Sequence, residues 1–342
     1  MTKRVKREDV AKLAGVSAAT VSYVLNGSRR VSPEIEKNVW EAASSLGYAN
    51  QSEQARECGE RVPQPNTIYY LTEDLFNVYQ LEAIDGFRRA ALEKDYFVHI
   101  FDTRDDSKKY MEHILRYPPE GVYVLTAPNS FTDEDLAKLR DVGVRILADF
   151  ARNTYIPGVS YVMSDMFNGF EQAVRYLYEN GHTQIGYVSA FDETCYYDFR
   201  LTAFKTAMRK VIGNHLPAVE YGSILCYQTT EESGREIMRD MLKNHPEVTA
   251  VICTNDLMAM GAIKEIKKHG LRVPEDISVI GVDDIKASAT FNPPLTTIAQ
   301  DGKSYGNFAF GALYEDIKTG KTGKYIVPMN LVVRQSTGQV RK

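Results

Sequence analysis

The sequence predicts a small all-α head followed by two α/β units, each built on a doubly wound parallel sheet. Three observations support this prediction: helical spacing before residue 48, a polar stretch at 51–66, and a later alternation of short apolar runs with amphipathic segments. With 342 residues, of which 25% are charged, the chain is longer than one typical core and differs from disordered chains. The predicted boundaries are 1–50 for the head, 51–66 for a linker and 67–336 for the core.

The head contains the start and stop signals of three short helices. Gly15 permits the positive φ of a tight turn after the first helix, Val16 can fill the angle between helices, and Ser17 can cap the second. Ser32 can cap a third helix in which Pro33 takes the first helical position. This spacing predicts a helix-turn-helix arrangement, with an αα corner of an unrelated helical module as the alternative.

The core shows a βα rhythm that predicts parallel sheets. Polar side chains follow the predicted strands, at the positions Asp149, Arg200, Asn255, Asp283 and Gln300. Open parallel sheets bind ligands at the carboxyl ends of their strands, so two such units that face each other would suit a small molecule.

Charge and composition limit the classes of function. Residues 1–50 hold eight Lys and Arg against five Asp and Glu, a net charge of +3, so the remainder carries -7 of the total of -4. A cationic head is typical of nucleic-acid contact, although solvated faces also show small positive excesses. The cysteines at 58, 195, 226 and 253 have no metal-ligand spacing and favour a reducing cytoplasm. No apolar run is long enough to span a membrane, and no catalytic motif occurs, so we predict no enzyme, no cofactor and no metal site.

Longer segments carry a family resemblance. DVAKLAGVSAATVSYVLNG and VSPEIEKNVWEAASSLGY resemble the DNA-binding head of the lactose-repressor (LacI/GalR) family of bacterial transcription regulators. TNDLMAMGAI, VPEDISVIGVDDI and NPPLTTIAQD resemble the effector-binding core of that family. The resemblance implies a core of the periplasmic-binding-protein type, with one subdomain at 67–163 plus 295–326 and the other at 164–294 plus 327–336. It also implies a cytoplasmic homodimer that binds a double-stranded DNA operator.

The resemblance assigns the DNA contacts to the second helix and its surroundings. The positions that match base-reading residues are Ala18, Ala19 and Tyr23, and those that match backbone-contacting residues are Ser17, Thr20, Ser22 and Asn26. We expect phosphate contacts from Lys6, Arg7, Arg29 and Arg30. Alanine cannot form a bidentate hydrogen bond with a base, so the operator sequence does not transfer from relatives. For Tyr23, a ring packed on the helix flank is the alternative.

The stretch after residue 48 departs from the hinge helix of the family. Residues 49–58 lack the leucine that wedges into the minor groove in relatives, and Glu53 and Glu57 would approach phosphates with the wrong sign. We therefore predict that hinge intercalation and strong DNA bending are weak or absent.

The resemblance also assigns an effector site in the core. The matching positions are Tyr79, Asp149, Arg200, Asn255, Asp283 and Gln300, with Tyr196 at the mouth of the site or simply packed. Carboxylates, an amide and a guanidinium around aromatic rings suit a sugar, and the predicted function is a repressor controlled by such an effector. A nucleobase or phosphorylated metabolite acting as co-repressor is the alternative, followed by a solute receptor without DNA function. Helix capping stays open for Asn255 and Asp256, and a structural ion pair stays open for Arg200 and Asp283.

Overall fold

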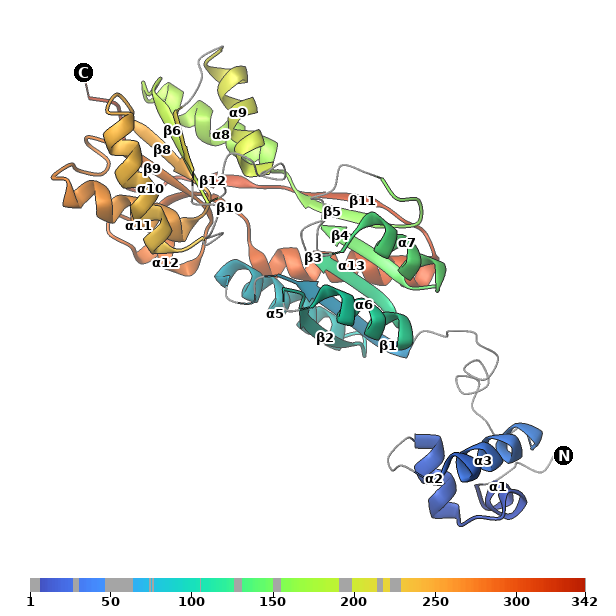
Figure 1. Cartoon of the computed structure of the whole chain (residues 1–342). Helices are drawn as coiled ribbons and strands as arrows, with labels where there is room; N and C mark the ends of the chain where they lie inside the picture. Colours follow the sequence, from blue (N-terminus) through green and yellow to red (C-terminus); the bar gives the residue numbers. More distant parts are fainter. Residues whose placement is uncertain are drawn as a thin grey trace. The chain divides into compact units, whose positions relative to one another are not determined.

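The computed structural model describes both the head and the core. The described ranges are 7–26, 31–46, 64–73, 75, 77–104, 106–125, 131–149, 155–190, 199–213, 218–221 and 229–341. The chain divides into two compact units, of which one contains the three helices of the head and the other contains two β-sheets (Figure 1). The hinge prediction for residues 49–58 lies outside the described residues. None of the helices within the described ranges combines the length and apolar composition needed to cross a membrane.

Three helices form the head: α1 (Arg7–Ala14), α2 (Ala18–Asn26) and α3 (Pro33–Ser45). Gly15 has a φ of +67° between α1 and α2, as a tight turn requires. The Ser17 hydroxyl accepts a hydrogen bond from the backbone N–H of Thr20 at 3.0 Å, and the Ser32 hydroxyl accepts one from the backbone N–H of Ile35 at 3.4 Å. The predicted caps and the helix-turn-helix arrangement are therefore confirmed.

One small core joins the three helices of the head. Val10, Val21 and Val39, one from each helix, are fully buried. Val16 packs against this cluster from the turn, as its position predicted. Because helices of this length are marginal alone, their shared core is what stabilises them.

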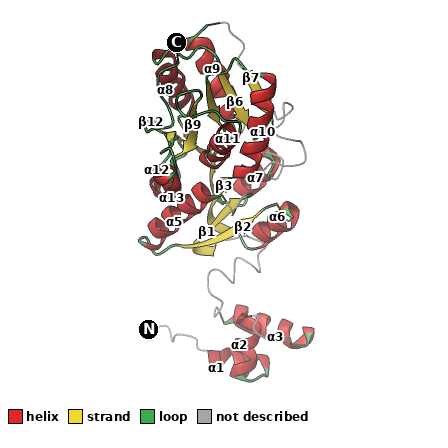
Figure 2. Ribbon diagram, turned by 90° about the vertical axis from the view of Figure 1, so that its left-hand side faces the viewer, coloured by secondary structure: helices red, strands yellow, loops and turns green. Residues whose placement is uncertain are grey.

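The first lobe of the core is a six-stranded sheet with the strand order β11-β5-β4-β3-β1-β2. The pairs β1–β2, β3–β4, β4–β5 and β5–β11 are parallel. Helices α5 and α13 pack on one face, while α6 and α7 pack on the other (Figure 2). The bounds are β1 (Gln64–Thr72), α5 (Val78–Leu92), β2 (Phe97–Asp102), α6 (Ser107–Arg116), β3 (Pro119–Leu125), α7 (Asp133–Asp141), β4 (Arg145–Asp149), β5 (Ser160–Ser164), α13 (Gly302–Thr319) and β11 (Lys324–Val327).

The second lobe repeats this plan with the strand order β12-β10-β9-β8-β6-β7. The pairs β6–β7, β6–β8, β8–β9 and β9–β10 are parallel, and the edge strand β12 is antiparallel to β10. Helices α8 and α9 cover one face, and α10 and α11 cover the other. The bounds are α8 (Met166–Glu179), β6 (Ile185–Ser189), α9 (Phe199–Val211), β7 (Ala218–Tyr221), α10 (Glu231–Asn244), β8 (Ala250–Cys253), α11 (Asp256–Lys268), β9 (Ser278–Asp283), α12 (Lys286–Thr290), β10 (Thr296–Ala299) and β12 (Asn330–Val332).

The chain passes between the lobes three times: after β5, after β10 and after β11. The second passage differs from the sequence-based boundary, which placed residues from 295 onward in the first lobe. Strand β10 instead pairs with β9 and β12, so the chain leaves the second lobe only after Ala299. The reason is that TTIA is a buried strand that completes the second sheet, whereas the first lobe regains the chain with α13.

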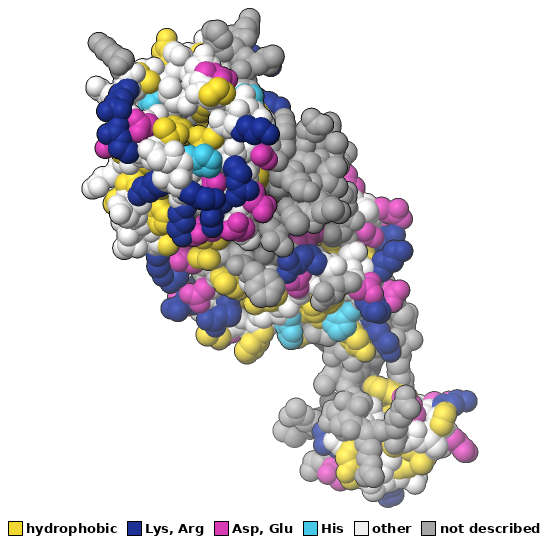
Figure 3. All heavy atoms as spheres, turned by 60° about the vertical axis from the view of Figure 1, so that its left-hand side comes forward, with side chains coloured by type: hydrophobic (Ala, Val, Ile, Leu, Met, Phe, Trp, Pro, Cys, Tyr) yellow, Lys and Arg dark blue, Asp and Glu magenta, His cyan; other side chains and the backbone are white. Residues whose placement is uncertain are grey.

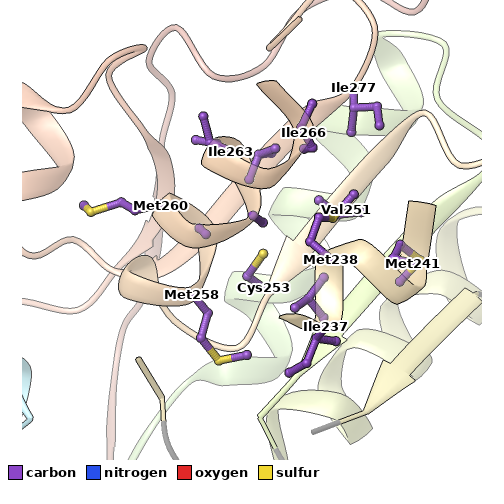
Figure 4. Packing of buried hydrophobic residues seen from close by; sticks show 14 of the residues in the cluster. Ile237, Met238, Met241, Val251, Cys253, Met258, Met260, Ile263, Ile266 and Ile277 are labelled. Carbon is purple, nitrogen blue, oxygen red and sulfur yellow. The ribbon is translucent and has the colours of Figure 1, made fainter. Parts of the chain in front are cut away.

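Each lobe contains one pair of helices in close backbone contact. In the α5–α13 pair, a Cβ added at Gly306 would lie 1.9 Å from the carbonyl oxygen of Ala83. In the α10–α11 pair, a Cβ at Gly261 would lie 2.0 Å from the carbonyl oxygen of Glu231. Beneath the second pair, Met238, Met258 and Cys253 belong to one buried cluster (Figure 4). Glycine is required at both crossings because any side chain would force the helices apart.

The surface of the core mixes charges of both signs. In the space-filling view, Lys and Arg side chains lie next to Asp and Glu side chains (Figure 3). Examples in the second lobe are the ion pairs Lys264–Glu231 at 2.6 Å and Arg272–Asp276 at 2.9 Å. These pairs balance charge locally, in contrast to the net positive charge of the head.

Candidate functional site

Helix α2 presents two of the predicted base-reading residues on one exposed face. Ala19 is exposed, and Tyr23, one turn later on the same face, is 38% exposed. At this exposure the base-contact prediction and the alternative of a ring packed on the helix flank both stay open for Tyr23. Ala18 is half-buried, so its surface available to a base is smaller. Contact with DNA stays a prediction for all of these positions.

The remaining predicted DNA contacts lie around the start of α2. The hydroxyls of Ser17 and Thr20 share a hydrogen bond of 2.8 Å, and Arg7 Nη1 donates to Ser22 Oγ at 3.4 Å. The free N–H groups and the positive end of the dipole make such a helix start a favourable place for a phosphate. Asn26 is the last residue of α2, and Lys6, Arg29 and Arg30 lie outside the described residues.

The candidate effector site lies where the central strands of both sheets end. In the first sheet the strand order reverses between β1 and β3, and in the second it reverses between β6 and β8. Ligands of open α/β sheets bind at such points. We call the polar residues found there the strand-end cluster: Tyr70, Tyr79, Tyr123, Asp149 and Tyr305 from the first lobe, Arg200 and Asp283 from the second, and Gln300 from the passage between them.

The first lobe contributes a carboxylate surrounded by tyrosines. Asp149, at the end of β4, accepts hydrogen bonds from Tyr305 Oη at 2.5 Å and from Tyr123 Oη at 3.3 Å. The rings of Tyr79 and Tyr305 are 6.3 Å apart and tilted by 52°. Burial, followed by the charges of Asp283 and Asp149, raises the pKa of Tyr79 well above its ordinary value. These hydroxyls therefore stay protonated and act as neutral donors.

The second lobe contributes a buried ion pair. Arg200 Nη2 lies 2.9 Å from Asp283 Oδ1, and Arg200 Nη1 donates to the carbonyl oxygen of Thr254 at 2.5 Å. Burial raises the pKa of the Asp283 carboxyl, and the Arg200 guanidinium opposes that effect. Asp283 also has a φ of +107°, a conformation that costs a non-glycine residue about 1–3 kcal/mol. Backbone strain therefore accompanies the placement of this carboxylate.

Three buried polar atoms of the strand-end cluster have no hydrogen-bond partner among the described residues. They are Tyr70 Oη, Tyr79 Oη and Gln300 Oε1. The other end of the Gln300 amide donates to Ser164 Oγ, which joins the two places where the chain passes between the lobes. An unpaired buried polar atom costs about 1–3 kcal/mol, so these three atoms are candidates for pairing with a polar ligand.

Asn255, one of the predicted effector residues, is not part of this cluster. Asn255 accepts a hydrogen bond from the backbone N–H of Met258 at 2.9 Å and donates to the carbonyl oxygen of Thr229 at 3.1 Å. Both ends of its amide are thus engaged at the start of α11, which favours the capping interpretation. Tyr196 lies outside the described residues.

The sequence analysis missed three tyrosines of the cluster: Tyr70, Tyr123 and Tyr305. The first two lie inside the apolar runs TIYYL and GVYVL, where a buried aromatic ring looks like ordinary core. A usable signal exists, because a tyrosine in the middle of a fully buried strand needs a partner for its hydroxyl.

A helix-turn-helix head joined to a two-lobed α/β core defines a class of DNA-binding regulatory protein, and comparison with known proteins agrees. Residues 8–51 match the model for bacterial regulatory proteins of the lacI family, and residues 174–337 match a periplasmic binding protein-like domain. The HTH-type transcriptional repressor PurR of Aliivibrio salmonicida is 33% identical over 96% of this chain and 98% of its own length. PurR of Mannheimia succiniciproducens is 31% identical over 97% and 98%.

Solved structures give the same relationship. The transcriptional regulator CelR in complex with cellobiose has a TM-score of 0.69 at 26% identity, covering 97% of this chain and 100% of that one. The lac repressor dimer bound to operator and the anti-inducer ONPF has a TM-score of 0.70 at 25% identity, covering 98% and 100%. The chain belongs to the LacI family and is a DNA-binding transcriptional repressor.

Proposed function

We propose that operator binding by this repressor is controlled by a small molecule that binds at the strand-end cluster. The observation that carries the proposal is the convergence of three unpaired buried atoms, Tyr70 Oη, Tyr79 Oη and Gln300 Oε1, with Asp149 and the Arg200–Asp283 pair. A ligand that pairs these atoms recovers their desolvation cost and adds charge-assisted hydrogen bonds to Arg200 or Asp283.

We further propose that the effector is a nucleobase acting as co-repressor, and more specifically a purine base, rather than the sugar that the sequence favoured. The relatives that share about a third of their residues with this chain over nearly its whole length are PurR repressors, and the purine class follows that relationship. The chemistry also suits a flat base, because Arg200 offers donors, Asp283 and Asp149 offer acceptors, and tyrosine rings can stack on its faces.

A sugar remains the second candidate because one structural neighbour, CelR, was solved with cellobiose at 26% identity to this chain. Hydroxyl groups could also pair with the tyrosine hydroxyls and carboxylates of the cluster. The two candidates differ in the shape they need, since a base is planar whereas a sugar ring is puckered.

We propose that the head binds duplex DNA as part of a homodimer, with α2 in the major groove of each half-site. Ala19 and Tyr23 on the exposed face of α2 contact base edges, and Arg7 with Lys6, Arg29 and Arg30 contacts phosphates. The effector shifts operator affinity if it binds one arrangement of the lobes more tightly than another. The usual size of such coupling is about 1–3 kcal/mol, which corresponds to about 5–150-fold in affinity.

One experiment tests operator binding and the purine effector together. It uses an operator duplex that the purified protein selects from random DNA. Its affinity is measured by fluorescence anisotropy alone and with adenine, guanine, hypoxanthine or cellobiose. We expect at least one purine base to tighten binding, and Arg200→Lys, which keeps the charge but loses the planar fork, to abolish that response. A response to cellobiose alone would overturn the purine class, and a purine response that survives Arg200→Lys would show that the ligand binds elsewhere.

A further inference from the structure

We propose that Asp256 and Thr297 are positioning residues for the effector site: they fix the turn that carries Asp283, and so set effector affinity without touching the effector. This inference rests on the proposed function of the strand-end cluster. It assigns a role to a buried network in the second lobe that the sequence analysis did not identify.

The turn after β9 needs external support. Asp283 has a φ of +107° and Asp284 a φ of +54°, so two successive non-glycine residues adopt conformations that L-residues rarely take. A strained backbone of this kind persists only where contacts with the surrounding structure hold it in place. The next residue, Ile285, takes the N-cap position before α12 and gives that helix no side-chain cap.

Asp256 supplies the missing support from α11. Its Oδ2 accepts hydrogen bonds from the backbone N–H of Ile285 at 2.9 Å and from Ser288 Oγ at 2.7 Å. It thereby acts as the cap of α12 from a different helix. Strand β9 makes room for this carboxylate, because a Cβ added at Gly281 would lie 2.1 Å from Asp256 Oδ1. Asp256 thus holds, by these hydrogen bonds, the residues that follow the strained turn.

Thr297 connects Asp256 to the turn itself. Its hydroxyl donates to Asp256 Oδ1 at 2.6 Å and accepts from the backbone N–H of Asp284 at 3.3 Å. Both side chains are almost completely buried, so each of these bonds is made away from water. Burial and the charge of nearby Asp283 raise the pKa of Asp256 to about 7, which agrees with two carboxylates lying in one electrostatic neighbourhood.

The opposite side of the turn is fixed by the C-terminal segment. Arg334 Nη2 lies 2.7 Å from Asp284 Oδ1, and Arg334 Nη1 donates to the carbonyl oxygen of Leu295 at 2.7 Å. Thr297 and Asp256 therefore hold the turn from one side and Arg334 holds it from the other, while the Asp283 side chain pairs with Arg200. If the turn relaxed to a negative φ at Asp283, the direction of its side chain would change and the pair with Arg200 would be lost.

Thr297→Val and Thr297→Ser form the matched test, since valine keeps the shape without the hydroxyl and serine keeps the hydroxyl. In the ligand-free crystal structure of Thr297→Val, we expect the turn at 283–284 to relax and the Arg200–Asp283 distance to lengthen. We expect the affinity for guanine, measured by calorimetry, to fall about tenfold in Thr297→Val, as for the loss of one buried hydrogen bond, and to stay within about twofold of the wild type in Thr297→Ser. Asp256→Asn should reproduce the loss.

A control separates positioning from general stability. Asp276→Asn removes a carboxylate that pairs with Arg272 and Arg341 and precedes β9, at the opposite end of that strand from the turn. It should lower the melting temperature and leave guanine affinity unchanged. An unchanged turn and an unchanged Arg200–Asp283 distance in Thr297→Val would overturn the positioning role. If the wild type binds no purine base while the turn relaxes in the variant, the effector class is wrong and the positioning role stands.

Discussion

The two lobes of the core have the same doubly wound plan but contribute different chemistry to the strand-end cluster. The first lobe surrounds Asp149 with the hydroxyls of Tyr123 and Tyr305. The second lobe pairs Asp283 with Arg200 and places that carboxylate on a strained turn. One lobe therefore offers neutral donors on relaxed backbone, whereas the other offers an ion pair whose geometry must be maintained by neighbouring residues.

This difference shows how one topology can divide the work of binding a single ligand. The tyrosines come from β1, β3, α5 and α13, and their positions follow from ordinary packing of the first lobe. The ion pair depends on Asp256, Thr297 and Arg334, which hold the turn after β9. We expect the stability of the protein to be more sensitive to substitution at the ion pair of the second lobe than at the tyrosines of the first lobe.

The largest effect is expected from Arg200→Ala. The substitution leaves the Asp283 carboxylate buried without a counter-charge, which costs about 3–5 kcal/mol in the free energy of unfolding. Asp149→Asn in the first lobe keeps an acceptor for the tyrosine hydroxyls and should cost only about 1 kcal/mol. Urea denaturation of both variants measures the difference. Equal losses would mean that the two halves do not differ in the way proposed here.

A comparable effect is expected where the helices of the first lobe cross. Gly306→Ala would place a Cβ 1.9 Å from the carbonyl oxygen of Ala83, and forcing α5 and α13 apart should cost about 3 kcal/mol. Gly311→Ala in the same helix meets open space and should stabilise the protein by about 0.5–1 kcal/mol through helix propensity. Gly261→Ala should match Gly306→Ala, because the second lobe has an equivalent crossing. Thermal denaturation gives the order, and a tolerated Gly306→Ala would show that the helices can separate.

The sequence was sufficient for the plan of the molecule and for part of the site. Helical and strand periodicity predicted the three-helix head and both sheets, and residues placed after strands led to Asp149, Arg200, Asp283 and Gln300. The tyrosines of the strand-end cluster could not be predicted in this way, since Tyr70 and Tyr123 have the pattern of core residues. The network at Asp256 and Thr297 joins positions 41 residues apart, and no local pattern encodes such a contact.

A smaller effect, with opposite signs in two assays, is expected from Tyr79→Phe. The substitution removes a buried hydroxyl that lacks a partner among the described residues, so ligand-free stability should stay the same or rise by about 1 kcal/mol. Effector affinity should fall about tenfold, because the hydroxyl is proposed to pair with the ligand. Tyr305→Phe is the matched control, since its hydroxyl donates to Asp149 and its loss should lower stability as well. A Tyr79→Phe protein with full effector affinity would remove Tyr79 from the site.

The smallest effect is expected from acid, and it should fall on the second lobe. His182 is buried there, with ring nitrogens 2.9 Å from Thr249 Oγ1 and 3.0 Å from the carbonyl oxygen of Gly338, and burial lowers its pKa. The folded state therefore binds fewer protons at His182 than the unfolded state does. The stability that His182 contributes is complete above the ordinary histidine pKa of about 6.5 and is lost as the pH drops below it. In the first lobe, His99 and His113 are exposed. The raised pKa of Asp256 acts in the opposite direction in the same lobe, so the contribution of His182 is read as the difference in pH dependence between the wild type and His182→Gln. Hydrogen exchange of the second lobe between pH 7 and pH 5 measures that difference, with His99→Gln as the control. Less loss of protection on acidification in His182→Gln than in the wild type would confirm the assignment, whereas the same pH dependence in both proteins would contradict it.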